Sequence, residues 1–258
     1  MADIFDVGGK TALVTGGSRG IGLMIARGLL QAGARVIVSS RKTADVEQAA
    51  AQLAEIGDCV AIPADVSSLE GAAALAAATA ERFPALDLLV NNAGATWGAP
   101  LEDFPASGWD RVAHTNVEGV FHLTVGLLAP LRAAASAEDP ARVINIGSID
   151  GMRVPSMENY SYSASKAAVH MLTRHLAKRL APEHITVNAI APGPFESKMM
   201  AFALQDPATR SAIEQSVPLG RIGRADDVAG LVRFLASRAG SYVTGEVIAL
   251  DGGITGCG

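Results

Sequence analysis

The sequence lacks the features that several classes of protein require. Its only cysteines, Cys59 and Cys257, lie far apart and supply neither a disulfide framework nor the ligand spacing of a zinc site. Lysine and arginine form no cluster, and the formal net charge of -5 disfavours contact with a phosphate backbone. We therefore expect no metal site and no nucleic-acid partner.

Long hydrophobic runs are also missing. No apolar stretch approaches the ~18 residues that a membrane helix needs, and the N-terminal M-A-D-I-F-D is acidic where a secretory signal is basic. These absences predict a cytoplasmic protein without membrane contact. Aromatic residues make up only 5% of the chain, whereas alanine and glycine are abundant, which favours one domain of closely packed helices and strands.

Short apolar runs alternate with longer stretches whose apolar residues recur at helical spacing. Predicted strands cover 11–15, 35–39, 59–63, 86–90, 142–146, 185–190 and 246–250. Predicted helices cover Gly20–Ala32, Asp45–Ile56, Leu69–Phe83, Trp109–Ala135, Ser163–Leu180 and Asp226–Ala236. This alternation is typical of an α/β domain with a parallel sheet covered on both faces.

Four of the predicted strands finish in small or polar residues, at 15–18, 91–94, 147–148 and 191–194. Ligands of open parallel sheets bind just beyond the carboxyl ends of the strands. We therefore expect these four clusters to share one crevice.

The first cluster continues into T-G-G-S-R-G-I-G between a strand and a helix. Glycines in that setting permit a tight turn and a close approach of backbone N–H groups to a pyrophosphate at the helix N-terminus. The expected contacts with a dinucleotide are Gly16, Gly17, Ser18, Arg19, Gly20, Ile21 and Gly22.

The end of the second predicted strand indicates which dinucleotide binds. NAD sites usually carry an acidic residue there, but this chain has Ser40, Arg41 and Lys42. A guanidinium suits a 2'-phosphate, so Arg41, with Arg19 from the glycine loop, favours NADP(H) over NAD(H). The alternative is that Arg41 and Lys42 are ordinary solvated charges.

The stretch Y-S-Y-S-A-S-K places two tyrosines upstream of one lysine. Residues four apart share a helix face, so Tyr162 can point where Lys166 points, whereas Tyr160 cannot. A neighbouring ammonium is expected to lower the pKa of the Tyr162 phenol toward the range of a general acid or base. An exposed Tyr/Lys pair without chemistry is the alternative. Ser148, at a strand end, is placed to hydrogen-bond a substrate carbonyl, and Asn116 to anchor a water beside Lys166.

Taken together, the motifs resemble the short-chain dehydrogenases/reductases of the NADP(H)-preferring type over nearly the whole chain. They are T-G-G-S-R-G-I-G, N-N-A-G, H-T-N-V, I-G-S, Y-S-A-S-K, A-P-G-P-F-E-S and the late D-G-G. Within that family the chain looks most like 3-oxoacyl reductases of the rhamnolipid-pathway type. The resemblance implies a single-domain, Rossmann-like, doubly wound seven-stranded sheet of order 3-2-1-4-5-6-7.

The resemblance also implies roles for particular residues. Asn116, Ser148, Tyr162 and Lys166 would form a catalytic tetrad, with Lys166 also on the nicotinamide ribose. Further implied cofactor contacts are Asp65, Val66, Asn92, Ala93, Gly94, Pro192, Gly193, Phe195 and Ser197. Ser197 stands where the family often has threonine, and Pro194 removes one backbone donor from its loop.

These observations predict reversible hydride transfer between NADPH and a ketone or 3-oxoacyl group. One alternative keeps the chemistry but acts on a polyol, sugar acid or steroid alcohol; another is a non-catalytic NADP-binding regulator. Substrate choice is expected to lie with 151–159 and with a lid at about 195–216, whose apolar residues are Met199, Met200, Phe202 and Leu204.

Two expectations concern the rest of the molecule. The histidines at 114, 122, 170, 175 and 184 lack metal spacing and are expected to be surface residues or hydrogen-bonded core residues. The helices predicted at 109–135 and 163–180 are apolar on more than one face and could pack against a second subunit, and the resemblance implies a homodimer or homotetramer.

Overall fold

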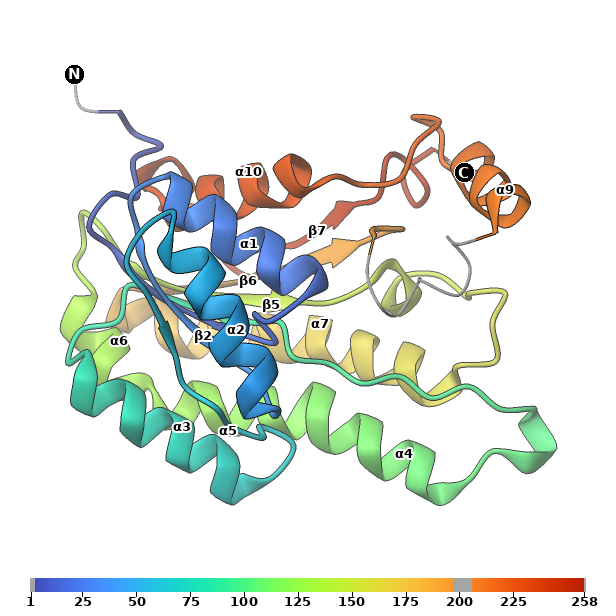
Figure 1. The fold of residues 1–258 in the computed structure, drawn as a ribbon, viewed down its shortest axis with the longest axis horizontal. Coiled ribbons are helices and arrows are strands. Elements are labelled where there is room, and N and C mark those ends of the chain that lie inside the picture. Colours follow the sequence, from blue (N-terminus) through green and yellow to red (C-terminus); the bar gives the residue numbers. More distant parts are fainter. Residues whose placement is uncertain (1–2, 197–205, 258) are drawn as a thin grey trace.

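A computed structural model describes residues 3–196 and 206–257. Its centre is a parallel seven-stranded sheet of order β3-β2-β1-β4-β5-β6-β7, which confirms the expected fold class and strand order (Figure 1). The strands are β1 Thr11–Thr15, β2 Arg35–Ser39, β3 Cys59–Ala61, β4 Leu88–Asn91, β5 Ala141–Ile146, β6 Ile185–Pro192 and β7 Val247–Leu250.

Helices cover both faces of the sheet (Figure 1). One layer holds α1 Gly20–Gln31, α2 Thr43–Ala54 and α10 Ala225–Ala236. The other holds α3 Leu69–Arg82, α4 Ala106–Ala113, α5 Gly119–Gly126, α6 Leu128–Ala134 and α7 Tyr160–Leu180. A further helix, α9 Pro207–Ser216, lies beyond the end of the sheet, and the short turns η2 His114–Glu118 and η3 Ile149–Gly151 belong to the site described below.

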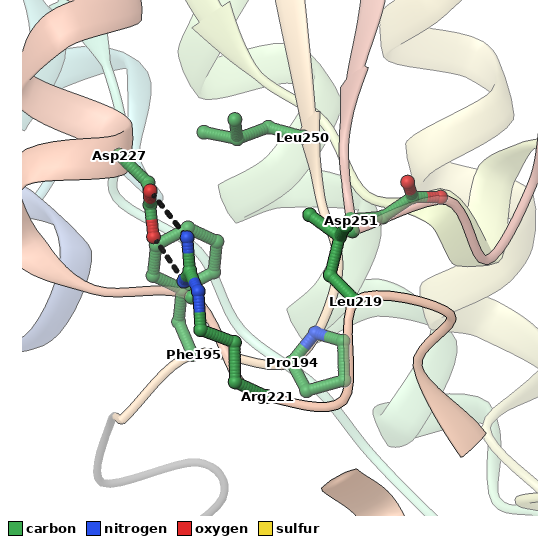
Figure 2. Close-up of a pocket in the computed structure, with 9 residues that line it drawn as sticks. Pro194, Phe195, Leu219, Arg221, Asp227, Leu250 and Asp251 are labelled. Atoms are coloured by element: carbon green, nitrogen blue, oxygen red, sulfur yellow. Dashed lines mark hydrogen bonds and ion pairs between the residues drawn. The ribbon is translucent and has the colours of Figure 1, made fainter. Parts of the chain in front are cut away.

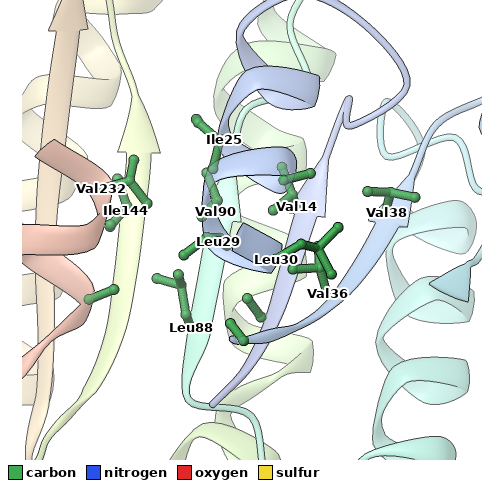
Figure 3. Packing of buried hydrophobic residues seen from close by; sticks show 14 of the residues in the cluster. Val14, Ile25, Leu29, Leu30, Val36, Val38, Leu88, Val90, Ile144 and Val232 are labelled. Atoms are coloured by element: carbon green, nitrogen blue, oxygen red, sulfur yellow. The ribbon is translucent and has the colours of Figure 1, made fainter. Parts of the chain in front are cut away.

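Side chains along each strand point alternately to the two faces of the sheet and form two separate hydrophobic cores. Val14, Val36 and Val90 point to the face covered by α1, where they pack with Ile25 and Leu29 (Figure 3). On the other face, side chains of β1, β2, β4, β5 and β6 pack against α3, α5 and α7; they include Leu13, Ile37, Leu89, Val143 and Val187. Because both faces are buried, the strands read as continuous apolar runs in the sequence.

The prediction of a single helix over Trp109–Ala135 is wrong. The segment begins at Ala106, passes through the π-helical turn η2, and breaks after Gly126 with a bend of 56° before α6. Pro130 explains the break, because a proline ring clashes with the carbonyl four residues earlier, here that of Gly126. The other predicted elements are present, and their ends differ by a few residues.

Among the described residues, no single helix is long and apolar enough to cross a membrane. Only the bent pair 106–126 and 128–134 meets the length and composition for a span. Within the same residues, no group of three or more histidine, cysteine, aspartate or glutamate side chains is arranged to hold a metal ion.

Candidate active site

The loop after β1 has the backbone that a phosphate site needs. Gly16 and Gly20 have positive φ values of 65° and 54°, which favour glycine. A side chain at Gly22 would have its Cβ within 2.4 Å of both Asn92 Nδ2 and the Gly16 carbonyl. Arg19 precedes α1 and makes no capping bond from its side chain, so it leaves the first-turn N–H groups available to an anion.

The N-N-A-G segment after β4 is fastened to this loop. Asn92 Nδ2 donates to the Thr15 carbonyl at 2.8 Å, and the Ala93 N–H donates to Thr15 Oγ1 at 3.0 Å. Two of the four predicted clusters therefore meet at the carboxyl edge of adjacent strands β1 and β4.

The end of β2 fits an adenosine 2'-phosphate. Ser40 Oγ is buried and has no hydrogen-bond partner within the described part of the chain. Arg41, Lys42 and Arg19 are exposed, and none of them forms an ion pair there. Next to this strand, the Ala64 N–H donates to the Ser40 carbonyl at 3.1 Å, which brings the Asp65–Val66 segment to the same edge. An unpaired hydroxyl with free cations is a suitable donor set for a phosphate.

The third cluster forms the turn η3 after β5. Ser148 is 7% exposed, and its Oγ accepts a hydrogen bond from the Asp150 N–H at 3.1 Å. That bond uses a lone pair of the oxygen and not the Ser148 hydrogen, which can therefore donate to a neighbouring acceptor. A Cβ at Gly151 would lie 2.7 Å from the backbone of Lys166, so the serine turn packs directly against α7.

The two tyrosines of α7 face different surroundings. The Tyr160 hydroxyl donates to Glu158 Oε1 at 3.0 Å, and its ring packs edge-on to Phe104 at 5.5 Å. The Tyr162 hydroxyl lies close enough to that of Ser148 for the serine to lower its pKa. Lys166 Nζ lies 5.5 Å from the centroid of the Tyr162 ring, as the helical spacing predicts.

Burial dominates the electrostatics of this pair. It raises the pKa of Tyr162 to about 12, with the serine hydroxyl opposing it and the Asp150 carboxylate adding to it. Burial also lowers the pKa of Lys166 to about 8, against the effect of Asp150. The expected lowering of the Tyr162 pKa is therefore not found. The Lys166 ammonium lies over the tyrosine ring and donates to the Ile146 carbonyl at 2.7 Å. Lys166 is also buried itself, which disfavours its charged form.

Asn116 lies in the π-turn η2 and is 1% exposed. Its Oδ1 accepts from the Ala95 N–H at 2.8 Å, while its Nδ2 donates to the Ala95 carbonyl at 3.0 Å and to Ser165 Oγ at 2.9 Å. A Cβ at Gly94 would lie 3.5 Å from Asn116 Oδ1 and 3.8 Å from Lys166 Nζ. The asparagine thus borders the lysine across Gly94, and its role in a water relay stays a prediction.

A buried polar network beneath the site was not predicted. Asn91 Nδ2 donates to Thr124 Oγ1 at 3.1 Å and to Asn145 Oδ1 at 2.9 Å, and Asn145 Nδ2 donates to Thr173 Oγ1 at 2.9 Å. Asn91 and Asn145 are partners in the β4–β5 register. Two asparagines near the ends of successive apolar strands were the sequence signal for this pair.

The loop after β6 borders the site on its other side. The Gly193 N–H donates to the Leu250 carbonyl at 3.0 Å, and a Cβ at this glycine would lie 2.8 Å from that of Asp251. Pro194 lacks an N–H, but its carbonyl accepts from Gly223 at 2.8 Å, which fixes the loop. Ser197 and the four apolar lid residues 199, 200, 202 and 204 lie outside the described residues.

The side chain of Phe195 is 2% exposed and belongs to the core, and the expected contact of this residue with the nicotinamide stays a prediction. A Cβ on Gly223 would come within 2.3 Å of its ring, so the phenyl group fills the space that this glycine leaves. Figure 2 shows the ring beside Arg221, which makes two bonds to Asp227, at 2.7 and 2.9 Å. These residues line a cavity of about 80 Å³ under the loop.

His170 is a core residue, which is one of the two expected positions, but one of its ring nitrogens lacks the expected hydrogen bond within the described chain. It is 6% exposed, and its Nε2 finds no hydrogen-bond partner among the residues described. A Cβ at Gly147 would lie 2.2 Å from this nitrogen, so the imidazole packs against the strand end that carries Ser148. Burial, followed by the charges of Lys166 and Arg174, lowers the pKa of His170 to about 4.

A doubly wound parallel sheet, a glycine-rich turn at a helix N-terminus and a Ser/Tyr/Lys cluster at the same edge define a dinucleotide-dependent oxidoreductase. A family model described as enoyl-(acyl carrier protein) reductase matches residues 16–255. The chain belongs to this family, which is part of the short-chain dehydrogenases/reductases.

Several relatives match along nearly their full length. The rhamnolipid biosynthesis 3-oxoacyl-[acyl-carrier-protein] reductase of Pseudomonas aeruginosa is 52% identical, covering 98% of this chain and 99% of that protein. A galactitol 2-dehydrogenase of Cereibacter sphaeroides is 39% identical, covering 98% and 97%. A 3beta-hydroxysteroid dehydrogenase of Eggerthella lenta is 36% identical, covering 97% and 95%.

Two solved structures show the same fold. The P. aeruginosa RhlG/NADP active-site complex superposes with a TM-score of 0.96 at 52% identity, covering 99% of this chain and all of that one. A gluconate 5-dehydrogenase of Burkholderia cenocepacia, in complex with NADP and tartrate, superposes with a TM-score of 0.91 at 32% identity, covering 99% of each chain.

Proposed function

We propose that this protein reduces a 3-oxoacyl group or related ketone to a secondary alcohol with NADPH. The observation that supports it best is the convergence of Ser148, Tyr162 and Lys166 near the N-N-A-G segment, which is bonded to Thr15 at the start of the glycine-rich loop. The 52% identical relative is a 3-oxoacyl reductase of rhamnolipid biosynthesis, and the 52% identical solved structure is a complex with NADP.

The proposal gives each side chain one task. The Ser148 O–H donates a hydrogen bond to the substrate carbonyl, and the Tyr162 hydroxyl transfers its proton to that oxygen as it becomes an alkoxide. A phenol with a pKa of about 12 keeps this proton throughout the neutral range. Lys166 would hold the ribose and feed the proton path that Asn116 borders. When bound, the nicotinamide supplies the hydride.

Cofactor binding follows from the fit described above. The N–H groups at the start of α1 would hold the pyrophosphate, and Arg41 with Ser40 and Arg19 would hold the 2'-phosphate. Asp65, Val66 and the N-N-A-G segment would border the nucleoside.

An apolar rim favours a hydrophobic substrate. Met152, Val154 and Met157, in the loop between η3 and α7, are 47%, 92% and 49% exposed. Solvent-exposed apolar side chains next to a catalytic site are suited to bind the acyl chain of a substrate. We propose that this loop and a lid at about 195–216, which includes α9, select the substrate.

The test measures NADPH consumption by the purified protein against short and long 3-oxoacyl thioesters, simple ketones and sugar-derived ketones. We expect a thioester to be preferred. Tyr162→Phe should lower kcat/KM by about 100-fold or more while NADPH still binds, because loss of a general acid typically costs ~10²–10⁴ in rate. Tyr160→Phe is the matched control, since its hydroxyl faces Glu158, and it should retain most of the activity.

Other outcomes would favour the alternatives. A preference for polyols or steroid alcohols would mean that this protein shares the substrate class of the 36–39% identical dehydrogenases. NADPH binding without turnover of any carbonyl would indicate a regulator. A Tyr162→Phe enzyme with the parental rate would overturn the assignment of the proton donor.

We also propose that the chain forms a homodimer or homotetramer through α4, α5 and α7. Trp109 on α4, Phe121 and Val125 on α5, and Met171 on α7 are 42–53% exposed. Phe121 and Val125 are four residues apart and share one helix face. Large apolar side chains of this kind are typical of surfaces that pair with another subunit.

A further inference from the structure

An additional carboxylate lies in the site without a role in the proposed reaction. Asp150 is half-buried on η3, two residues after Ser148. Its N–H donates to Ser148 Oγ at 3.1 Å, and the next residue, Gly151, packs on the backbone of Lys166. The turn that carries Asp150 therefore contacts both the Ser148 side chain and the backbone of Lys166.

A second contact connects Asp150 to the helix that carries the tyrosine. Asp150 Oδ2 accepts from Asn159 Nδ2 at 3.4 Å, and Asn159 Oδ1 accepts from Ser163 Oγ at 3.2 Å. Asn159 is 5% exposed and immediately precedes α7. The bond to Ser148 thus fixes the Asp150 backbone, while Asn159, which is bonded to the first turn of α7, holds the carboxylate.

The charges around the Tyr162–Lys166 pair come from three segments. Asp150 lies on η3, Arg153 follows that turn, and His170 and Arg174 lie further along α7. His170 is neutral at ordinary pH, because burial holds its pKa near 4. Burial raises the pKa of Asp150, whereas Asn159, Arg153 and Lys166 oppose the rise. Among the described residues, Asp150 is the acidic group that acts on both members of the pair, and it raises the pKa of each.

We propose that Asp150 is a positioning residue for the proton-donating pair, and that its negative charge sets the upper end of the pH range over which carbonyl reduction proceeds. A carboxylate beside a phenol and an ammonium makes loss of a proton from either group less favourable. The protonated pair, which is the form that donates, then persists to higher pH. The inference rests on the proposed reductase function and adds a residue to it.

The principal variant is Asp150→Asn, which removes the charge but keeps an oxygen that can accept from Asn159. In the pH profile of kcat/KM for NADPH-dependent reduction, we expect its alkaline limb to move down by about one pH unit, the size of shift a nearby charge produces. Asp150→Glu should keep the limb near the parental position. Asn159→Ala breaks the bridge but leaves the carboxylate, so it should lower the rate without moving the limb.

A second readout needs no turnover. In protein labelled with ¹³C at lysine Cε, the Lys166 resonance, assigned by its loss in Lys166→Arg, should titrate about one pH unit lower in Asp150→Asn than in the parent. If the protein reduces no carbonyl, the proposed function fails and this titration alone decides the charge effect. If reduction occurs but Asp150→Asn lowers the rate at every pH with an unmoved limb, or if the lysine titration does not change, Asp150 has only a structural role and the inference is overturned.

Discussion

Tyr160 and Tyr162 lie two residues apart on α7, yet only one belongs to the site. Helical spacing predicts this from the sequence, because Tyr162 shares a face with Lys166 and Tyr160 does not. Their pKa values could not be predicted in the same way. The outcome depends on how deeply each group is buried and on Asp150, whose approach is decided by a turn outside the helix.

Arg41 allows the cofactor preference to be tested at one residue. Its exposed guanidinium forms no ion pair within the described chain and follows the unpaired Ser40 hydroxyl. In Arg41→Ala we expect the Kd for NADPH to rise by about 10- to 100-fold, the equivalent of ~1.5–3 kcal/mol for a hydrogen bond to a charged group. The Kd for NADH should change little. Fluorescence titration with both nucleotides measures this.

Arg35 provides the matched control for Arg41. It begins the same strand at the opposite edge of the sheet, where it pairs with Asp58 at 2.7 Å. Arg35→Ala should leave both dissociation constants near the parental values. If Arg41→Ala weakened NADPH and NADH equally, the arginine would not recognise the 2'-phosphate.

At the scale of elements, the sequence predicts every strand of the sheet but not the path of the segment 106–134. Periodicity shows that this segment is helical and apolar. It does not reveal the π-turn, since the extra residue there is stabilised by contacts of Asn116 with Ala95 and Ser165, which are distant in sequence. The bend before α6 is easier to predict from the sequence, because Pro130 is a helix-breaking residue.

The packing of α7 against the end of β5 depends on an uncharged His170. The pKa of this imidazole is lowered to about 4, whereas the unfolded chain takes up the proton near the ordinary 6.5. Between these values the unfolded state binds more protons, so the free energy of unfolding falls as the pH drops from about 6.5 to about 4. Allowing for partial screening by solvent, we expect a loss of about 1–3 kcal/mol.

Urea unfolding at about pH 7.5 and about pH 5 measures this effect. His170→Leu should reduce the difference in stability between the two conditions, because the group that titrates is gone. His175→Leu is the control, since His175 lies exposed on the same helix. A His170→Leu protein that lost stability on acidification as steeply as the parent would contradict the assignment.

At the scale of the whole molecule, the order of the strands brings the four clusters together. Their position at strand ends was evident in the sequence, and a parallel sheet places all such ends at one edge. The order β3-β2-β1-β4-β5-β6-β7 came from the family resemblance, because apolar runs do not state which strands are neighbours. The burial of the Phe195 ring could not be predicted from its motif, because it depends on Gly223, which lies 28 residues later in the chain.

If the chain assembles through α5, a substitution in that interface should lower the mass of the oligomer. In a two-fold interface each residue of the contact recurs on both subunits, so Phe121→Asp would bury two unpaired carboxylates. Sedimentation equilibrium of the parent should give a dimer or tetramer, and that of Phe121→Asp smaller species, because an unpaired buried charge costs several kcal/mol.

Leu69 supplies the control for this experiment. It is 58% exposed and is the first residue of α3, behind the Ser68 N-cap, where an acidic side chain suits the helix dipole. Leu69→Asp should therefore keep the parental mass. Circular dichroism of both variants shows whether the subunit remains folded. A parent that sediments as a monomer, or a folded Phe121→Asp that assembles as the parent does, would mean that α5 does not form the subunit contact.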